Sequence, residues 1–490
     1  MAELLQNIAS RLDDPSIPYQ KVVLCVLLSV SAFESFIGSR QKPYLDPVRF
    51  PNLPSALRPF LTSPDAHDTY RKSQSYARHK LSFSSVTGII GLLQSFLLLT
   101  NLSLPLLERF NVPNPTPLTR ATQGNWTLLK GLWDLAGMVP GVKGELKQTA
   151  SFIAIMNLMG TVLAVPEGLY KNFVLEEKHG FNKMTYGTFF KDLVKGLLLS
   201  FALEIPLSVG LVALIHWVGT SALLRLLAWV LGFSTLLVVL MVPLGPYVIM
   251  PLFNKFTPLE KDHPVYPKVR DLAQRVGFPC DRIYVIDGSK RSSHSNAFVT
   301  GIPGLQKQIV IYDTLLEKAT PDEVEAILAH ELAHWKFSHI IYLLLTALTQ
   351  IAFSLSLFTL FLSNSSLLTS FGFQQPLVSK LLSHTNLSTG PTVISLFLAS
   401  TLFSPLSGFL GFVTNTITRK LEYEADAFAV SLGDETAKNL KTALIGIHEK
   451  NLAVYQVDKL FSAWNHNHPT LIERLEALDK GIAEEQKKTK

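Results

Sequence analysis

Apolar residues in this chain gather in seven segments that are long enough, or nearly so, to cross a lipid bilayer. They run approximately over Val22–Ile37, Ser85–Leu107, Ser151–Tyr170, Leu193–Trp217, Leu226–Phe253, Ile340–Leu362 and Val393–Val413. Buried helices of a large soluble protein would also be apolar, but seven such runs in one chain favour membrane spans. The pattern therefore predicts a mainly α, multi-pass membrane protein.

The pattern between the fifth and sixth apolar segments is that of a small α/β unit. Val265–Val276 has the apolar spacing of an amphipathic helix, and Gly277 follows as its stop. Three short strand candidates come next, at Arg282–Ile286, Asn296–Thr300 and Gln308–Tyr312. This unit lies next to a further predicted helix.

That helix is predicted over Thr320–Trp335. Thr320 is a good N-cap, Pro321 suits the first helical position, and Glu323 completes a capping box. An apolar stripe of Val324, Ile327, Leu328 and Leu332 gives it a face to bury. We accordingly divide the chain into residues 1–253 with five spans, 254–339 with the α/β unit, 340–413 with two spans, and 414–490.

The composition supports a membrane protein. Hydrophobic residues make up 48% of the 490 residues and charged residues only 17%, which is too apolar for an ordinary soluble protein. The net charge of +6 could suggest a nucleic-acid partner, but no basic helix or stacking-aromatic module is present, so we expect none. With only two cysteines, neither a disulfide framework nor a cysteine zinc site is expected.

Lys and Arg are concentrated in the loop between the first two segments and in the loop between the third and fourth. The positive-inside rule makes those loops cytosolic, which places residues 254–339 and 414–490 in the cytosol and the N-terminus in the lumen. The sequon asparagines Asn101, Asn125, Asn364 and Asn386 all fall in or beside the lumenal loops of this topology. The Lys487–Lys490 tail reads as a dilysine signal and suggests residence in the endoplasmic reticulum.

Several spans carry acidic residues that hydrocarbon would not accommodate, at Glu34, Glu167 and Glu204. Such residues either make interhelical hydrogen bonds or line a wet cavity. The sequence leaves both alternatives open.

The predicted helix Thr320–Trp335 contains the pattern H-E-x-x-H, with His330, Glu331 and His334. Two histidines four residues apart lie on one helical face and can bind one Zn²⁺, while the intervening glutamate can take a proton from water. Because the sixth span starts at Ile340, the site should lie close to the membrane surface.

A catalytic zinc site needs a third protein ligand. Glu422 and Asp426 follow the seventh span and are four residues apart in a helix-prone run. Glu422 would complete a His₂Glu site, and Asp426 on the next turn would orient a ligand histidine. Glu424 points about 200° away from Glu422 and is the poorer ligand candidate.

Six blocks of sequence resemble the type I CAAX prenyl endopeptidases, an integral-membrane zinc metalloprotease family. The blocks are Tyr70–Tyr76, Glu176–Lys183, Ser289–Ala297, His330–Trp335, Glu422–Asp426, and Leu460–Trp464 followed by His468-Pro469 and Glu473–Leu475. They occur in order along nearly the whole chain. Two positions differ from the usual pattern, with Ala333 where many members have Gly and Glu424 where Gln is common.

The resemblance implies a seven-helix barrel around an intramembrane chamber, capped by a cytosolic zincin-like α/β protease domain. It implies zinc as the cofactor and removal of the last three residues of a prenylated CaaX terminus, with a further N-terminal cut in a pheromone precursor in fungal members. His330, His334 and Glu422 are similar to the zinc ligands and Glu331 to the general base. His468 and Arg474 resemble the pair that stabilises the tetrahedral intermediate, and Asn296 and Ala297 the edge strand that receives substrate.

Two other functions remain as alternatives. A membrane quality-control peptidase would use the same zinc chemistry on misfolded or translocation-stalled proteins. A non-enzymatic channel or scaffold would hold a structural zinc, but such a site normally fills all four positions with protein ligands.

Overall fold

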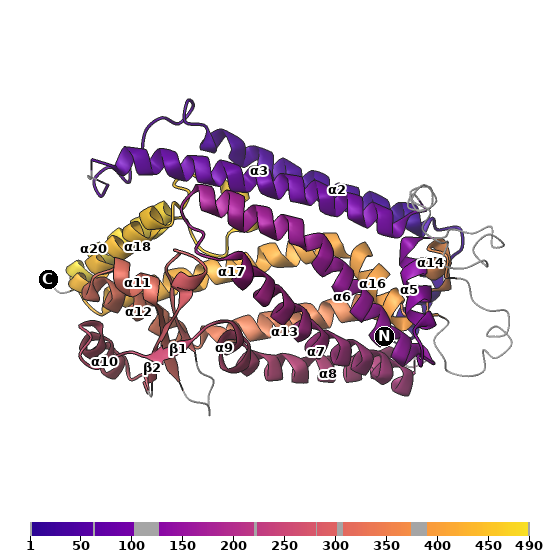
Figure 1. The fold of residues 1–490 in the computed structure, drawn as a ribbon. Helices are drawn as coiled ribbons and strands as arrows, with labels where there is room; N and C mark the ends of the chain where they lie inside the picture. Colours follow the sequence, from indigo (N-terminus) through magenta and orange to yellow (C-terminus); the bar gives the residue numbers. More distant parts are fainter. Residues whose placement is uncertain are drawn as a thin grey trace.

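The computed structural model describes residues 2–61, 64–101, 127–219, 223–280, 282–300, 307–373 and 390–488 of the chain. The sequon residues Asn125 and Asn386 and the final residues Thr489 and Lys490 lie outside this part. Long helices make up the body of the molecule, and a small sheet with several shorter helices forms one end (Figure 1).

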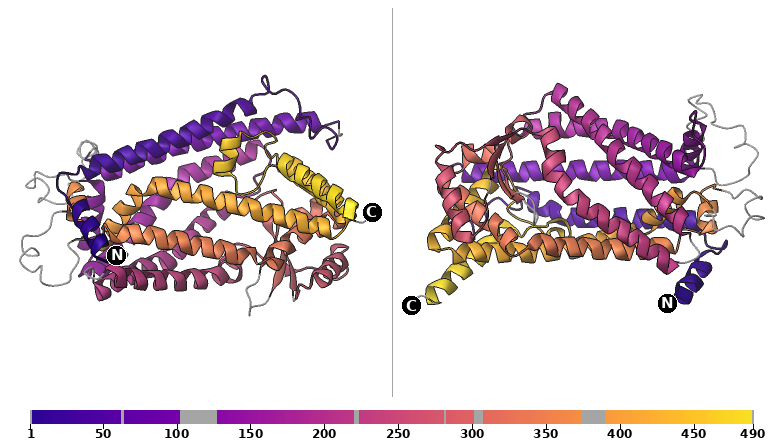
Figure 2. Two further views of the ribbon diagram at one scale, coloured as in Figure 1. Left: turned by 180° about the vertical axis from the view of Figure 1, so that it is seen from behind. Right: turned by 90° about the horizontal axis from the view of Figure 1, so that it is seen from below.

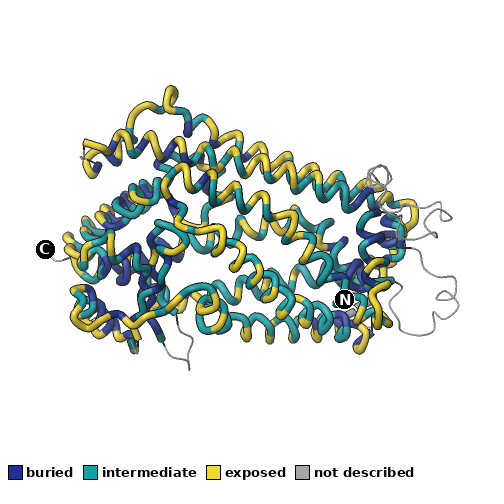
Figure 3. Tube along the Cα trace, viewed as in Figure 1, coloured by how far each residue is buried: buried dark blue, intermediate teal, exposed yellow. Residues whose placement is uncertain are grey.

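Six of the seven predicted spans correspond to helices that are long and apolar enough to cross a membrane. They are α2 (Tyr19–Gln41), α3 (Ala66–Leu99), α6 (Glu145–Tyr170), α7 (Tyr186–Val218), α8 (Leu223–Leu244) and α13 (His339–Thr359). Few residues in their most apolar windows are buried, and Figure 3 shows the buried positions gathered toward the two ends of the molecule. Exposed apolar helix surfaces of this extent are what a bilayer would cover.

The seventh predicted span, Val393–Val413, corresponds to two helices instead of one. It is a pair, α16 (Thr392–Leu402) and α17 (Ser404–Ser431), bent by 63° at the break. Pro405 favours a new helix start at this point, because proline has no N–H for an intrahelical bond and loses none in the first turn of a helix. The pair makes a seventh span if it crosses as one.

Helix α3 begins at Ala66, well before the predicted start at Ser85. Its first half carries Arg71, Lys72, Arg78 and Lys80, which hydropathy assigns to a loop although they continue the helix. Three other long helices are also continued by shorter helices. Helix α2 is followed by η1 (Lys42–Leu45), α6 by η3 (Lys171–Glu176), and α8 by η4 (Gly245–Ile249) and α9 (Met250–Phe253). Shorter helices α1 (Ala2–Leu12), α5 (Leu128–Met138) and α14 (Ser365–Ser370) lie at the end that bears the N-terminus (Figure 1).

The α/β unit contains a four-stranded sheet of order β1-β2-β4-β3. Strands β2 (Arg282–Ile286) and β4 (Gln308–Tyr312) have the predicted bounds and pair in parallel. Strand β3 (Ala297–Thr300) begins one residue later than predicted and pairs antiparallel with β4. Strand β1 (Phe256–Pro258) was not predicted, because three residues ending in proline give no strand signal.

The helices of this unit are α10 (Val265–Val276), η5 (Gly288–Lys290), α11 (Asp313–Lys318) and α12 (Pro321–Lys336). Helix α10 has the predicted bounds, and Gly277 ends it with a left-handed backbone at φ 76°, which glycine adopts without strain. The C-terminal helices α18 (Asp434–Lys450) and α20 (Leu471–Lys488) join the same end of the molecule (Figure 1), whereas the short α19 (Lys459–Asn465) packs against α2 and α17.

One hydrophobic core joins the α/β unit to the C-terminal segment. Val269 of α10, Ile309 of β4 and Leu328 of α12 are fully buried in it, together with Ala429 of α17 and Leu440 of α18. Residues from 254–339 and from 414–490 are thus packed together, although the sixth and seventh spans separate them in the chain. The four-part division of the chain itself stays a prediction.

The two termini lie at opposite ends of the long helices, as both views in Figure 2 show. The C-terminus belongs to the end with the sheet, and the N-terminus to the other end. Two cavities lie along α3. One of about 680 Å³ is lined partly by Glu34 of α2, and another of about 860 Å³ partly by Glu167 of α6. Those two acidic residues line cavities, the second of the alternatives that the sequence left open.

Candidate metal centre

Helix α12 positions both histidines of the motif through its own capping and packing. The predicted capping box is present, since Thr320 accepts a hydrogen bond from the Glu323 backbone and the Glu323 side chain accepts one from Thr320 N–H. The helix packs against α10, α17 and α18, and its apolar stripe is buried. His330 and His334 lie one turn apart on the face toward α17.

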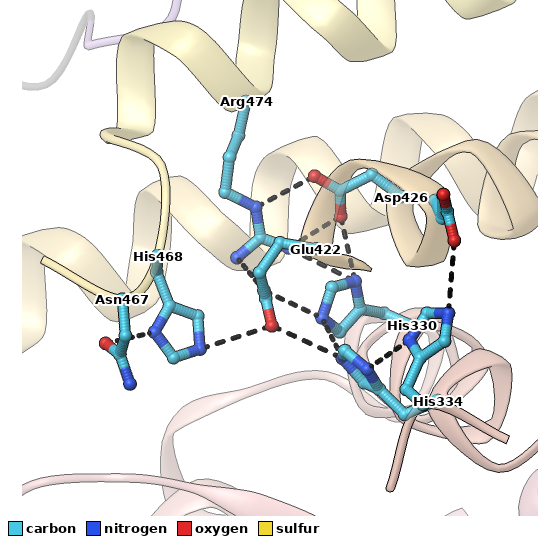
Figure 4. A network of polar contacts seen from close by, with 9 residues as sticks. His330, His334, Glu422, Asp426, Asn467, His468 and Arg474 are labelled. Atoms are coloured by element: carbon cyan, nitrogen blue, oxygen red, sulfur yellow. Dashed lines mark hydrogen bonds and ion pairs between the residues drawn. The ribbon is translucent and has the colours of Figure 1, made fainter. Parts of the chain in front are cut away.

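Glu422 of α17 meets the two histidines (Figure 4). Its Oε2 lies 3.3 Å from His330 Nε2 and its Oε1 3.4 Å from His334 Nε2, while the two Nε2 atoms are 3.3 Å apart. Possible ligand atoms of the three residues all lie within 4.8 Å of one another. The predicted ligands, distant in sequence, are therefore brought together.

The chemistry of this group fits a metal ion. Glu422 has only 3% of its surface exposed, and its Oε2 has no hydrogen-bond partner in the described part of the chain. A buried carboxylate oxygen without a donor is costly unless a cation satisfies it. Two imidazoles and one carboxylate are also the protein ligands of one class of catalytic zinc site, which keeps a fourth position for water.

Asp426 and Arg474 support His330 from the side opposite the ligand atoms. Asp426 Oδ1 lies 2.9 Å from His330 Nδ1, and Arg474 donates to both Asp426 oxygens, from Nε at 2.9 Å and from Nη2 at 2.6 Å. A proton on His330 Nδ1 directed at Asp426 leaves the Nε2 lone pair free for a metal. Asp426 lies where an orienting carboxylate was predicted.

Glu331 lies between the two histidines in sequence, and both are near enough to influence its carboxyl group. Burial raises the pKa of its carboxyl, and nearby His330 and His334 oppose that effect. A carboxylate with a raised pKa is a stronger base, which suits proton transfer near neutral pH.

The predicted pair His468 and Arg474 lies at the site, but the two residues differ in environment. His468 Nε2 is 3.4 Å from Glu422 Oε1, and its ring is half exposed and contacts Asn467 Oδ1 at 2.8 Å (Figure 4). Arg474 is buried and held by Asp426, with Nη1 4.0 Å from Glu422 Oε2. His468 is open to a substrate, whereas Arg474 is already paired.

The predicted substrate strand, β3, is one of the two edge strands of the sheet in the described part and packs against α12. Asn296 just before it is exposed, and its side chain accepts a hydrogen bond from Ala297 N–H at 2.9 Å. The Ala297 side chain is buried. Arg291, in the preceding loop, is held by a two-point ion pair with Asp192 of α7, so the edge strand is anchored to the membrane helices.

Sequence reasoning missed two neighbours of the site. His339, the first residue of α13, contacts His334, and Glu424 of α17 contacts His339. The sequence placed Glu424 away from Glu422 and did not connect it with His339. A third histidine five residues after His334 was the available signal.

The sequence profile of peptidase family M48 matches residues 260–482, and that of the CAAX prenyl protease N-terminal region, described as five membrane helices, matches residues 49–255. CAAX prenyl protease 1 of Saccharomyces cerevisiae is 34% identical over 96% of this chain and 97% of its own length. The human CAAX prenyl protease 1 homolog is 30% identical over 93% of this chain and 94% of its own. The crystal structure of S. mikatae Ste24p superposes with a TM-score of 0.81 at 32% identity, covering 95% of this chain and all of that one.

These matches confirm the predicted fold class. The chain is a mainly α membrane protein in which a helical, barrel-like chamber carries an α/β metalloprotease domain at one end. The matched regions cover both the membrane helices and the residues around the metal group.

Proposed function

Because this chain belongs to peptidase family M48, and within it to the CAAX prenyl proteases, we propose that it uses zinc to remove the aaX tripeptide from prenylated CaaX proteins. It is a multi-pass membrane metalloprotease of CAAX processing. The observation that carries the proposal is the group of His330, His334 and Glu422. A His₂Glu set with Glu331 beside it supports zinc and hydrolysis over a closed structural site.

In this mechanism the two histidines and Glu422 would hold the zinc ion, and Asp426 would keep His330 in the binding orientation. Zinc, when bound, acidifies water and polarises the scissile carbonyl. Glu331 accepts the proton of the attacking water and passes it to the leaving amine. His468, half exposed and 3.4 Å from Glu422, is placed to donate to the developing oxyanion, and Arg474 adds positive charge from behind.

The substrate tail would extend along β3, because an edge strand offers free backbone groups to an extended peptide. Asn296 and Ala297 at its start are the residues that receive the tail in this proposal. The prenyl group would enter the membrane part, where apolar helix surface adjoins the protease end.

We assign the protease end to the cytosol and the N-terminus to the lumen of the endoplasmic reticulum, with the inner nuclear membrane as a second location. Support for this orientation comes from the Lys- and Arg-rich loops and from the position of the termini at opposite ends of the helices. A second, N-terminal cut in a prenylated pheromone precursor is part of the same proposal.

The test is cleavage of a farnesylated CaaX peptide by purified full-length protein. We expect release of the tripeptide, loss of release with a chelator, and recovery when zinc is restored. A peptide without the farnesyl group is the control for substrate class. Equal cleavage of unmodified, unrelated peptides would favour the quality-control peptidase, and no cleavage despite bound zinc would favour the scaffold.

A further inference from the structure

The two ligand histidines differ in what contacts their second ring nitrogen. His330 Nδ1 faces the carboxylate of Asp426, but His334 Nδ1 lies 2.8 Å from the Nδ1 of another histidine, His339. His339 is only 1% exposed, and the two rings are nearly perpendicular, with 5.0 Å between their centroids. A histidine buried directly behind a metal ligand is an unusual supporting group, because such partners are mostly carboxylates or carbonyls.

Elementary hydrogen-bond chemistry fixes the protons in this pair. When His334 gives its Nε2 lone pair to a metal, its Nδ1 has to carry the proton. The Nδ1 of His339 must then be the acceptor, so His339 is neutral and carries its own proton on Nε2. With the proton of His334 on Nδ1, a second proton on His339 Nδ1 would place two N–H groups against each other across 2.8 Å.

Glu424 occupies the position that this arrangement requires. Its Oε2 lies 3.4 Å from His339 Nε2, and that nitrogen is buried without a hydrogen bond in the described part of the chain. The Glu424 side chain is 44% exposed and reaches the histidine from α17, two residues after Glu422. A carboxylate facing Nε2 favours the tautomer with the proton there.

The backbone before His339 is also held in an uncommon conformation. Ser338, between α12 and α13, has φ 56°, one of two non-glycine residues with positive φ in the described ranges. Left-handed backbone costs a non-glycine residue roughly 1 kcal/mol or more and persists only where the surroundings hold it. Here it turns the chain from α12 into α13 so that the first residue of the span returns to His334.

We propose that His339 and Glu424 are positioning residues that orient His334 for metal binding. In this arrangement the Glu424 carboxylate faces the Nε2–H of His339, and His339 Nδ1 accepts a hydrogen bond from the Nδ1–H of His334. The proposal rests on the metal role proposed for His334. It gives the site two different supports, an ion pair behind His330 and a neutral histidine behind His334. The second support links the metal site to the first turn of a membrane span.

The experiment measures zinc affinity of the full-length protein in detergent, by competition with a chromogenic chelator. His339→Phe keeps a ring and removes the acceptor, so zinc should bind about 10- to 100-fold more weakly. His339→Asn places an amide oxygen near the lost Nδ1 and should restore most of the affinity, whereas His339→Gln places its amide further out and should not. Glu424→Leu should weaken binding a few-fold and Glu424→Gln less.

His448→Phe is the matched control, because it makes the same ring exchange at a partly buried histidine of α18, whose Nε2 is buried, and should leave zinc affinity unchanged. Wild-type affinity in His339→Phe would overturn the proposal. If that variant does not fold, equal affinities of the Asn and Gln variants would overturn it instead. Absence of zinc binding by the unmodified protein would refute the proposed function. If the unmodified protein binds zinc and only the expected affinity changes of the His339 variants are missing, the proposed function still holds.

Discussion

Helices α12 and α17 both supply proposed metal ligands but reach the site in different ways. Helix α12 is a capped helix of 16 residues inside a core shared with α10 and α18, and both of its ligands lie one turn apart. Helix α17 has 28 residues, starts at a 63° bend, and carries Glu422 and Asp426 near its far end. The first helix is placed by apolar packing.

The second helix also contributes Ala425 and Ala429 to that core, and near the site polar contacts hold it in addition. Arg419 donates to Ser462 of α19 and to both carboxylate oxygens of Glu473 at the start of α20, and Arg474 of α20 pairs with Asp426. The proposed metal site thus combines a ligand pair defined by local sequence with a ligand defined by long-range assembly. Substitutions on the two helices should therefore affect zinc binding and peptide cleavage in different ways.

The largest expected effect comes from removing the ligand on α17. Glu422→Ala leaves only two protein ligands, so bound zinc and peptide cleavage should both fall to background. Metal content of the purified protein and tripeptide release check this. Glu435→Ala, at an exposed carboxylate in the first turn of α18, is the control and should change neither. Retention of stoichiometric zinc in Glu422→Ala would show that α17 does not supply a metal ligand.

The next effect separates chemistry from metal binding on α12. Glu331→Gln removes the proposed base but no ligand, so zinc content should stay at the wild-type level while kcat/KM falls by about 10²- to 10⁴-fold. Metal analysis and peptide kinetics on one preparation give both values. Full activity of a zinc-loaded Glu331→Gln protein would refute the role of Glu331, and loss of zinc would make Glu331 part of the ligand set.

The local character of α12 can be tested at its cap, where the smallest effect is expected. Thr320→Ala removes the N-cap oxygen and should destabilise the helix by about 1 kcal/mol. Amide hydrogen exchange in the first turn of α12 should then become about five-fold faster, because each 1.4 kcal/mol corresponds to a factor of ten. Thr320→Ser keeps the cap and should exchange like the wild type. Unchanged amide exchange in the alanine variant would show that packing alone determines where α12 begins.

The sequence predicts what short-range patterns determine. The bounds of α10, β2 and β4 and the capping box of α12 follow from spacing and turn residues within a few positions. Glu422 could be predicted because a two-span hairpin returns the chain to the same membrane face. The bend before α17 and the early start of α3 were missed because hydropathy windows detect apolar length and not helical continuity.

Contacts between distant helices were the least predictable part of the site. The ion pair of Asp426 with Arg474 depends on how α17 meets α20. The contact of His339 with His334 and Glu424 depends on the turn at Ser338 and on α17 passing beside α13. No single stretch of sequence carries that geometry.

The bend at the start of α17 has a mechanical consequence for the metal site. Glu422 lies about 18 residues after Ser404, an arm of roughly 27 Å at about 1.5 Å per residue, so a swing of about 5° would carry its carboxylate about 2 Å. Metal sites tolerate errors of about 0.2 Å in ligand distances. The contacts of Arg419, one turn before Glu422, therefore limit movement of the part of α17 that carries the carboxylate.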